Sequence, residues 1–309
     1  MKIFLVGKSG SITHWLEDAA EAFRAEGHSV RVGAVRRRWL SPGLETALAD
    51  PLAAAMARSA SRFAPDLILA IGGFHVPAGH LARLAALPRR PPLAAWVGDV
   101  FDDGSRAAAA AYDIVAYTDS RMLACHGALG FVSKAIFLPH AANAGPPPPP
   151  RARAPRMVFV GAATPGRRAA VQAIGSPIAL YGPGWIGDGH HEVHGGRIAH
   201  AAVGGLYAGH LAALNIRNEA NVLSGLNQRS FDPCLSATPV LSDAQGDLER
   251  CFEPGSEVLV WRDAEELNAA YDRLRQHPED AARIGEAGRR RVLAEHRFAH
   301  RLATLKAAL

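Results

Sequence analysis

Short apolar runs alternate with helical patterns along almost the whole chain, and this alternation constrains the fold more than any other feature. Such alternation is typical of βαβ units, whose strands join a parallel sheet with helices on both faces. The pattern stops once, at five consecutive prolines, Pro146–Pro150, and then restarts. Proline fixes φ and has no N–H to donate, so this tract is predicted to be an extended spacer. The 309 residues also exceed the roughly 100 to 200 residues of one domain, so two α/β domains are predicted.

The positions of the apolar runs predict where the strands of each domain lie. In the N-terminal part, strands are predicted at 2–6, 30–35, 67–71, 93–97, 114–117 and 135–138. The spacing of apolar residues between them predicts helices at about 12–26, 44–63, 77–87 and 119–127. After the prolines, strands are predicted at 157–160, 178–181, 212–216, 239–241 and 257–260. Helices are predicted there from residue 167, near 200–209 and 223–236, and at 263–276 and 278–295.

Composition limits the partners and the compartment. The formal net charge of +5 favours anionic ligands, which include phosphates, nucleic acids and anionic membranes. No basic motif with interleaved aromatic residues occurs, so a nucleic-acid partner is not predicted. The segment Met1–Val6 lacks the order of a signal peptide, and no apolar run reaches the roughly 20 residues of a membrane span. The three cysteines, Cys125, Cys234 and Cys251, do not predict a disulfide framework, and a cytoplasmic protein is expected.

Three motifs suggest phosphate or metal binding but lack residues that such sites need. Gly7-Lys8-Ser9 resembles the end of a P-loop, but Lys2 stands where the first glycine of that motif belongs. His190–His194 lies in a Gly-rich segment without a spaced partner motif, which favours a polar surface loop. Aspartates cluster at 99–103, yet no D-x-D triplet occurs in the chain. We therefore predict no metal site.

Several short motifs follow one another in the C-terminal half. They are Phe159-Val160-Gly161 before Arg167, Tyr181–Trp185, Leu206-Tyr207, Ala213–Arg217, Leu226–Asp232, Phe252–Val258, Trp261–Asp263 and Gly288–His296. In this order they resemble the CgeB-like (spore-maturation protein) branch of group 1 glycosyltransferases. The resemblance covers about residues 157–300. In the N-terminal half it is limited to Leu138–Asn143.

The resemblance implies a GT-B fold, in which two Rossmann-like, doubly wound α/β domains face a central cleft. Residues 1–144 would form the acceptor domain, 145–155 a proline-rich linker, and 156–309 the donor domain. Whether the last helix packs back on the N-terminal domain stays open. The implied activity is that of a metal-independent glycosyltransferase, which moves a sugar from a nucleoside diphosphate sugar to a hydroxyl-bearing acceptor without a further cofactor.

Two positions depart from the family pattern. Asp232 stands where such enzymes usually carry glutamate, and Ser224 stands where the broader group 1 pattern has an acidic residue. These departures weaken the transfer of that group's retaining mechanism to this chain. A nucleotide-sugar epimerase with the same fold, or a binding protein that has kept the GT-B shape, are the alternatives.

Candidate ligands of the donor's ribose and diphosphate lie close together in the sequence. Asp232 is the candidate for the ribose hydroxyls, with a helix-capping aspartate as the alternative. Arg229 lies three residues earlier, on nearly the same face of the predicted helix, and is the candidate for the diphosphate. Arg167 and the N-terminus of its helix are predicted to contact the diphosphate from another side. The alternative for both arginines is a solvated surface charge.

Other residues of the C-terminal half are candidates for the rest of the donor. Gly161 and Tyr181 end two predicted strands, and Gly182, Gly184 and Trp185 form the turn after the second. Trp185 would stack on the base or pack in the core. Asn218, Asn221 and Asn227 suit sugar hydroxyls, or satisfy turns.

An inverting transfer would need a general base from the N-terminal domain. Asp99, which follows the strand at 93–97, has the best position. His75 and His14 follow other strands and compete with it. The sequence therefore predicts Asp99 and His75 as catalytic candidates.

Overall fold

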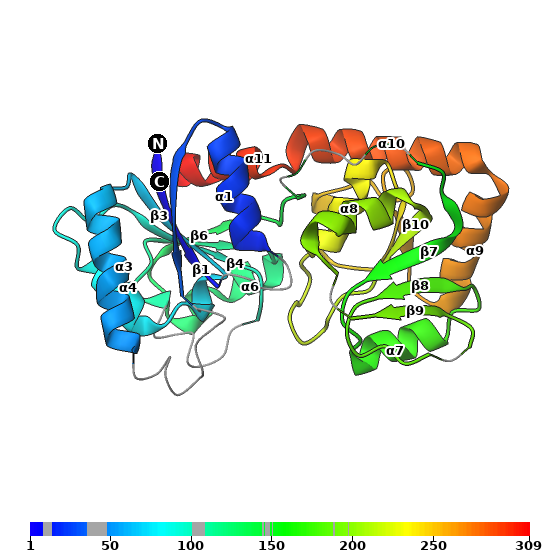
Figure 1. Ribbon diagram of the computed structural model, residues 1–309, viewed down its shortest axis with the longest axis horizontal. Helices are drawn as coiled ribbons and strands as arrows, with labels where there is room; N and C mark the ends of the chain where they lie inside the picture. The colour runs from blue at the N-terminus through cyan, green and yellow to red at the C-terminus, as the bar shows by residue number, and fades with distance from the viewer. Residues whose placement is uncertain are drawn as a thin grey trace. The chain divides into compact units, whose positions relative to one another are not determined.

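The computed structural model describes residues 1–8, 14–35, 48–100, 109–143, 145, 149, 151–187, 189–196 and 198–309. Contacts divide these residues into two compact units (Figure 1). The first comprises Met1–Pro139 and Phe298–Leu309, and the second comprises His140–Arg297. Each unit contains a six-stranded sheet in which all paired neighbours are parallel. The predicted pair of doubly wound α/β domains is confirmed. Most of the predicted proline spacer, residues 146–148 and 150, lies outside the described residues.

The first unit has the strand order β2-β1-β3-β4-β5-β6. Its central strands β3 to β5 are buried along their whole length, because helices cover both faces. The order reverses between β1 and β3, which makes that place the switch point of the sheet. The strands are β1 (Lys2–Gly7), β2 (Ser29–Ala34), β3 (Leu67–Ile71), β4 (Leu93–Val97), β5 (Ile114–Tyr117) and β6 (Lys134–Phe137). The helices are α1 (Trp15–Ala25), α3 (Ala49–Phe63), α4 (Ala78–Ala85), α6 (Ser120–Cys125), α11 (Phe298–Ala308) and the 3₁₀ helices η1 (Gly73–His75) and η2 (Gly127–Leu129).

The C-terminal helix α11 completes the core of the first unit, beside α1 (Figure 1). The ring of Phe298 lies edge-on to Trp96 of β4 at 5.8 Å and to Phe23 of α1 at 6.3 Å between centroids. Lys134 Nζ donates a hydrogen bond to the carbonyl of Ala308 at 2.6 Å. The start and the end of the chain therefore fold together.

The second unit has the strand order β12-β11-β10-β7-β8-β9, with its switch point between β7 and β10. Helices α7 and α9 pack on one face of the sheet, and α8 and the 3₁₀ helix η4 on the other. The strands are β7 (Ala154–Val160), β8 (Ile178–Tyr181), β9 (Glu192–Gly195), β10 (His210–Asn215), β11 (Val240–Asp243) and β12 (Leu259–Trp261). The helices are α7 (Pro165–Gln172), α8 (His200–Ala208), α9 (Ala264–Gln276), α10 (Pro278–Glu295) and the 3₁₀ helices η3 (Gln228–Ser230), η4 (Asp232–Ser236) and η5 (Leu248–Arg250).

The predicted helix at 223–236 is wrong. The segment forms two short 3₁₀ helices, η3 and η4, that meet at Phe231. Pro233 has no N–H to continue a helical ladder, and the side chain of Asn227 caps η3 by accepting from the N–H of Arg229. Arg229 and Asp232 therefore belong to different turns and do not share a helical face.

The segment after β8 also differs from the prediction of a polar loop, because residues 192–195 form the edge strand β9. Ala179 pairs with Glu192 and Leu180 with Val193. The strand is short and only half apolar, so its sequence lacks the clear alternation that marks longer strands.

Candidate functional site

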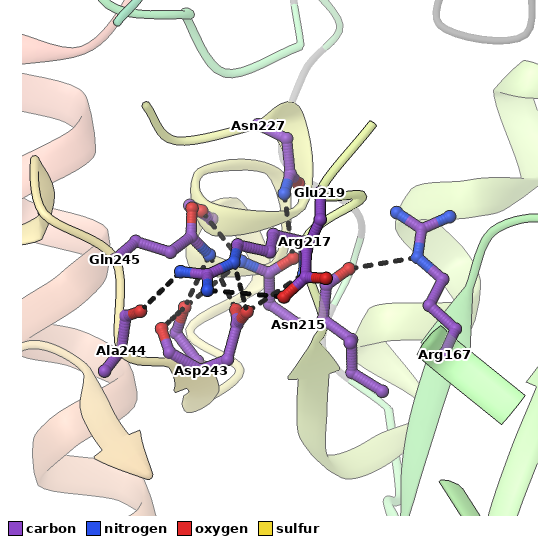
Figure 2. Close-up of polar contacts among 11 residues, drawn as sticks. Arg167, Asn215, Arg217, Glu219, Asn227, Asp243, Ala244 and Gln245 are labelled. Carbon is purple, nitrogen blue, oxygen red and sulfur yellow. Dashed lines mark hydrogen bonds and ion pairs between the residues drawn. The ribbon is translucent and has the colours of Figure 1, made fainter. Parts of the chain in front are cut away.

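The switch point of the second unit gathers most of the residues that the sequence predicts for the donor. Gly161 follows β7 and leads into α7, whose first turn is capped by the side chain of Thr164. Arg167 joins the ends of β7 and β10, because its Nε donates to the carbonyl of Ile216 at 3.1 Å and its Nη1 to that of Ala162 at 3.0 Å (Figure 2). Ligands of doubly wound sheets bind where neighbouring strands lead in opposite directions.

Arg167 and Arg229 lie against the same aromatic ring. Their guanidinium carbons are 5.4 and 5.5 Å from the ring centroid of Phe159. Burial, and then repulsion from Arg229, lowers the pKa of Arg167 to about 9. Burial also lowers the pKa of Arg229. Within the part of the chain that the structure describes, neither arginine forms an ion pair, and the buried Nε of Arg229 has no hydrogen-bond partner. The charge of Asp243 acts on both arginines, and that of Asp232 acts on Arg229, but two cations so close together still favour an anionic ligand.

Two amides, those of the buried Asn215 and the partly buried Asn227, fix the turn that carries Arg229, and Figure 2 shows the bond between them. Asn227 Oδ1 accepts from the N–H of Arg229 at 2.9 Å, and Asn227 Nδ2 donates to Asn215 Oδ1 at 3.1 Å. Asn215, at the end of β10, donates in turn to the hydroxyls of Ser230 at 3.0 Å and Ser242 at 3.1 Å. Asn227, predicted as a ligand of sugar hydroxyls, thus uses its amide to position Arg229.

The glycine turn after β8 lies against the end of β7. Gly182 has φ +130°, and a Cβ there would meet the carbonyl oxygen of Gly161 at 2.3 Å. Gly184 also has a positive φ, +84°. Trp185 donates from Nε1 to that same carbonyl at 2.8 Å and packs edge-on against Phe159 at 5.7 Å. Of the two expectations for Trp185, the structure shows the packing contact.

Tyr181 and Asp232 lie apart from the arginine pair. Tyr181 is stacked on His194, with ring centroids 4.2 Å apart, and packs in the cluster beneath α8. Asp232 Oδ1 accepts from the backbone N–H of Asn143 at 2.8 Å. Its carboxylate still acts on the charges of Arg229 and Arg297, because it raises the pKa of both.

A pocket of about 510 Å³ opens beside Arg167, at the carboxyl ends of β10, β11 and β12. Of the predicted asparagines, Asn218 lines this pocket and donates from Nδ2 to Asn221 Oδ1 at 2.8 Å. Sequence reasoning missed Arg217, Asp243 and Trp261, which also line the pocket. Each stands within two residues of the end of a strand. Ligands of doubly wound sheets bind at strand ends, so this position in the sequence could have identified the three residues.

Ser224, one of the two departures from the family pattern, is buried behind the turn. Its hydroxyl donates to Asp247 Oδ2 at 3.1 Å, and the N–H of Asp247 donates to its carbonyl at 3.0 Å. The serine therefore connects two loops of the second unit.

The two catalytic candidates of the first unit lie together at the carboxyl ends of β3 and β4. His75 ends η1 after β3, Asp99 follows β4, and His75 Nε2 is 3.2 Å from Asp99 Oδ2. Both side chains are about half-exposed, at 44% and 45%. His14 precedes α1 with φ 48°. Ser9 and the aspartates at 102 and 103 lie outside the described residues.

The motif at His190–His194 is used in local contacts. His191 Nε2 is 3.1 Å from the carbonyl of Val171, and His194 Nε2 is 2.8 Å from Glu192 Oε1. Within the described ranges, no group of three or more His, Cys, Asp or Glu side chains is arranged to hold a metal ion. In the same ranges, no helix has the length and apolar character that crossing a membrane requires.

The chain is similar to known proteins both in sequence and in fold. A family model described as "Glycosyl transferase-like" matches residues 164–307. HepE of Anabaena, solved with UDP, is 14% identical over 100% of both chains, with a TM-score of 0.68. Sucrose-phosphate synthase of Thermosynechococcus elongatus is 14% identical over 100% of this chain and 98% of its own, with a TM-score of 0.66. A glycosyltransferase of Rickettsia africae is 12% identical over 99% and 97%, with a TM-score of 0.67. No curated protein sequence matches the chain.

The structural likeness spans both units, and the fold is GT-B, as the sequence predicts. The matched segment begins at the cap of α7 and includes η3, η4 and the pocket. The sequence match to the glycosyl transferase-like model is thus confined to residues 164–307, whereas the likeness in fold extends over the whole chain.

Proposed function

We propose that the enzyme transfers a sugar from a nucleoside diphosphate sugar to a hydroxyl-bearing acceptor, with the donor bound by the second unit and the acceptor by the first. The observation that carries the proposal is the pair Arg167 and Arg229 on the ring of Phe159, neither of which forms an ion pair within the described residues. HepE has been solved with UDP-glucose and with UDP and glucose, which supports this donor class. The motif order favours the CgeB-like branch within the group.

The leaving group of this transfer is a nucleoside diphosphate, on which negative charge develops. Preorganised cations in a dry site stabilise such charge strongly. Arg229 and Arg167 would receive the diphosphate, together with the N–H of Gly166 at the start of α7, since Pro165 has no N–H and that of Arg167 is bonded to Thr164. We propose that these groups replace a divalent metal, and that the carboxylate of Asp232 accepts from the ribose hydroxyls.

Binding of nucleotides tests this proposal. We expect at least one of UDP, GDP, dTDP and ADP to raise the unfolding temperature, and CMP, which lacks the second phosphate, to raise it less. Saturation at 100 times Kd stabilises the folded state by about 2.7 kcal/mol. No shift with any of the five would refute the proposed donor site. Release of free sugar or an epimer without an acceptor would favour the epimerase, and binding without any turnover would favour the binding protein.

The pair His75 and Asp99 is the proposed base for the acceptor hydroxyl. Asp99 would hold the imidazole in one orientation, and the other ring nitrogen would take the proton. We expect His75→Ala and Asp99→Asn each to lower kcat by about 10²- to 10⁴-fold. The Kd of the donor nucleotide should not change, because both residues belong to the first unit. Steady-state kinetics and calorimetric titration measure the two quantities.

The competing residue His14 provides the comparison for this experiment. His14→Ala should leave kcat within a factor of two or three of the unmodified enzyme, because local effects of surface substitutions are small. A loss of kcat with His14→Ala, and none with His75→Ala or Asp99→Asn, would reject the pair as the base.

A further inference from the structure

Strand β2 is an edge of the first sheet, and its outer side is suited to pairing with another strand. It has six residues and pairs with β1 in one unbroken register, from Ser29 to Ala34. Among the described strands, the other three edges are less suited, because β12 has three residues, β6 has four, and the register of β9 shifts at Tyr181. Short strands and irregular register protect a sheet edge from further pairing, and β2 has neither protection. The one charged side chain of β2, Arg31, is held against α3 by a hydrogen bond to the carbonyl of Ser59.

The backbone groups on the outer side of β2 belong to every second residue. The N–H of Ser29 points inwards, because it donates to the segment that contains β1 at 3.0 Å. Backbone direction alternates along a strand, so the N–H and C=O groups of Val30, Val32 and Ala34 point outwards. Arg24 of α1 contacts this row, since its Nη2 donates to the carbonyl of Val30 at 3.3 Å. The outer side of β2 therefore offers alternating donors and acceptors to another strand.

A groove of about 340 Å³ lies beside this edge, between β2 and α1. Its lining includes the side chain of Val32, which is 38% exposed. Its charged residues, Glu17, Glu21 and Arg24, are four and three positions apart and share one face of α1. The stripe is acidic towards the start of the helix and basic at its end. Such an order of charges is complementary to a second, antiparallel copy of itself.

One two-fold axis satisfies both the strand and the helix. Helix α1 runs antiparallel to β2, because Arg24 near its end contacts Val30 near the start of the strand. An axis through Val32, perpendicular to the sheet, would pair β2 with its copy in antiparallel order, with Val30 opposite Ala34. The same axis places Arg24 of one copy opposite Glu17 of the other. The strand spans roughly 20 Å and the helix about 16 Å, so both layers fit one interface.

We propose that the protein forms a two-fold symmetric dimer through β2, in which the sheets of two first units become one continuous sheet. Backbone hydrogen bonds join the two strands, and two ion pairs between Glu17 and Arg24 join the two copies of α1. A groove with charges of both signs in this order favours a second copy over a partner of a single charge. The inference does not rest on the proposed function, because none of these residues is a proposed ligand or base.

Sedimentation equilibrium of the full-length protein tests the dimer. The unmodified protein should sediment at twice the mass of the chain at micromolar concentration. Val32→Pro should raise the dimer Kd roughly 5- to 150-fold, the equivalent of two hydrogen bonds, because proline removes only the outward N–H and leaves the pairing with β1 intact. Circular dichroism monitors the fold of each variant.

Charge reversal tests the antiparallel order. Glu17→Arg and Arg24→Glu should each raise the dimer Kd roughly 4-fold or more, because each places like charges across both ion pairs. The double variant should restore the Kd, because it exchanges the two charges and keeps them opposite. Arg58→Glu is the matched control, since it makes the same change of charge at an exposed position of α3 and should leave the Kd unchanged.

Three outcomes would overturn the proposal. The first is an unmodified protein that stays monomeric at every concentration. The second is a dimer that neither Val32→Pro nor the two charge reversals weaken, which would place the interface on another surface. The third is a dimer that both charge reversals weaken but the double variant does not restore, which would reject the pairing of Glu17 with Arg24. If Val32→Pro does not fold, the charge-reversal series decides the outcome.

Discussion

Replacing Arg229 by methionine should abolish the stabilisation by nucleoside diphosphates and, at the same time, raise the unfolding temperature of the ligand-free protein. The arginine is desolvated, repelled by Arg167 and lacks a partner for its Nε among the described residues. Hydrogen bonds to charged groups contribute about 1.5 to 3 kcal/mol each, so loss of two would weaken the donor about 100-fold or more. Replacing buried ion pairs by apolar side chains has stabilised other proteins by about 1 to 4 kcal/mol, and Arg229 would leave no ion-pair partner behind among the described residues. Methionine can pack against Phe159 in place of the guanidinium.

Differential scanning calorimetry with and without the best nucleotide measures both effects in one experiment. Arg290→Met is the control, because Arg290 is exposed on α10 and the same charge is removed. We expect Arg290→Met to change neither the unfolding temperature of the ligand-free protein nor the rise in that temperature on nucleotide binding. A lower unfolding temperature for Arg229→Met, with nucleotide binding intact, would show that Arg229 is structural.

The interior strands of both units were predictable because they are buried on both faces. Residues 67–71, 93–97 and 178–181 read as continuous apolar runs, and the structure has strands with those same limits. The segment that carries Arg229 and Asp232 was not predictable in the same way. Its polar side chains bond to nearby backbone and to Asn215, which favours turns over a helix, and this competition depends on the tertiary fold.

Contacts within the candidate sites depend on strand order, which the sequence pattern does not contain. His75 and Asp99 are 24 positions apart and meet because β3 and β4 are neighbours in the sheet. Arg167 and Ile216 are hydrogen-bonded because β7 and β10 are neighbours in the sheet, although they are not consecutive in the sequence. The sequence therefore predicted His75, Asp99 and Arg167 individually, and only the structure shows which residues they contact.

Phe298→Ala is expected to have the largest effect on stability. The side chain is 1% exposed and packs edge-on to Trp96 and Phe23, which join α11 to β4 and α1. Removing a buried phenylalanine ring costs about 3 to 5 kcal/mol. Although α11 lies at the end of the sequence, it belongs to the first unit. We therefore expect the loss of stability to affect the first unit. Calorimetry should show a transition at lower temperature, while nucleotide binding at 20 °C is retained.

Leu309→Ala serves as the comparison, because Leu309 follows the same helix and is 47% exposed. A substitution at such an exposed site should change the free energy of unfolding by less than about 0.5 kcal/mol. If Phe298→Ala had an equally small effect, α11 would not complete the core of the first unit. If it instead removed nucleotide binding, the stability of the second unit would depend on α11. Retained binding with a destabilised first unit would show that the donor site needs only the second unit's own core.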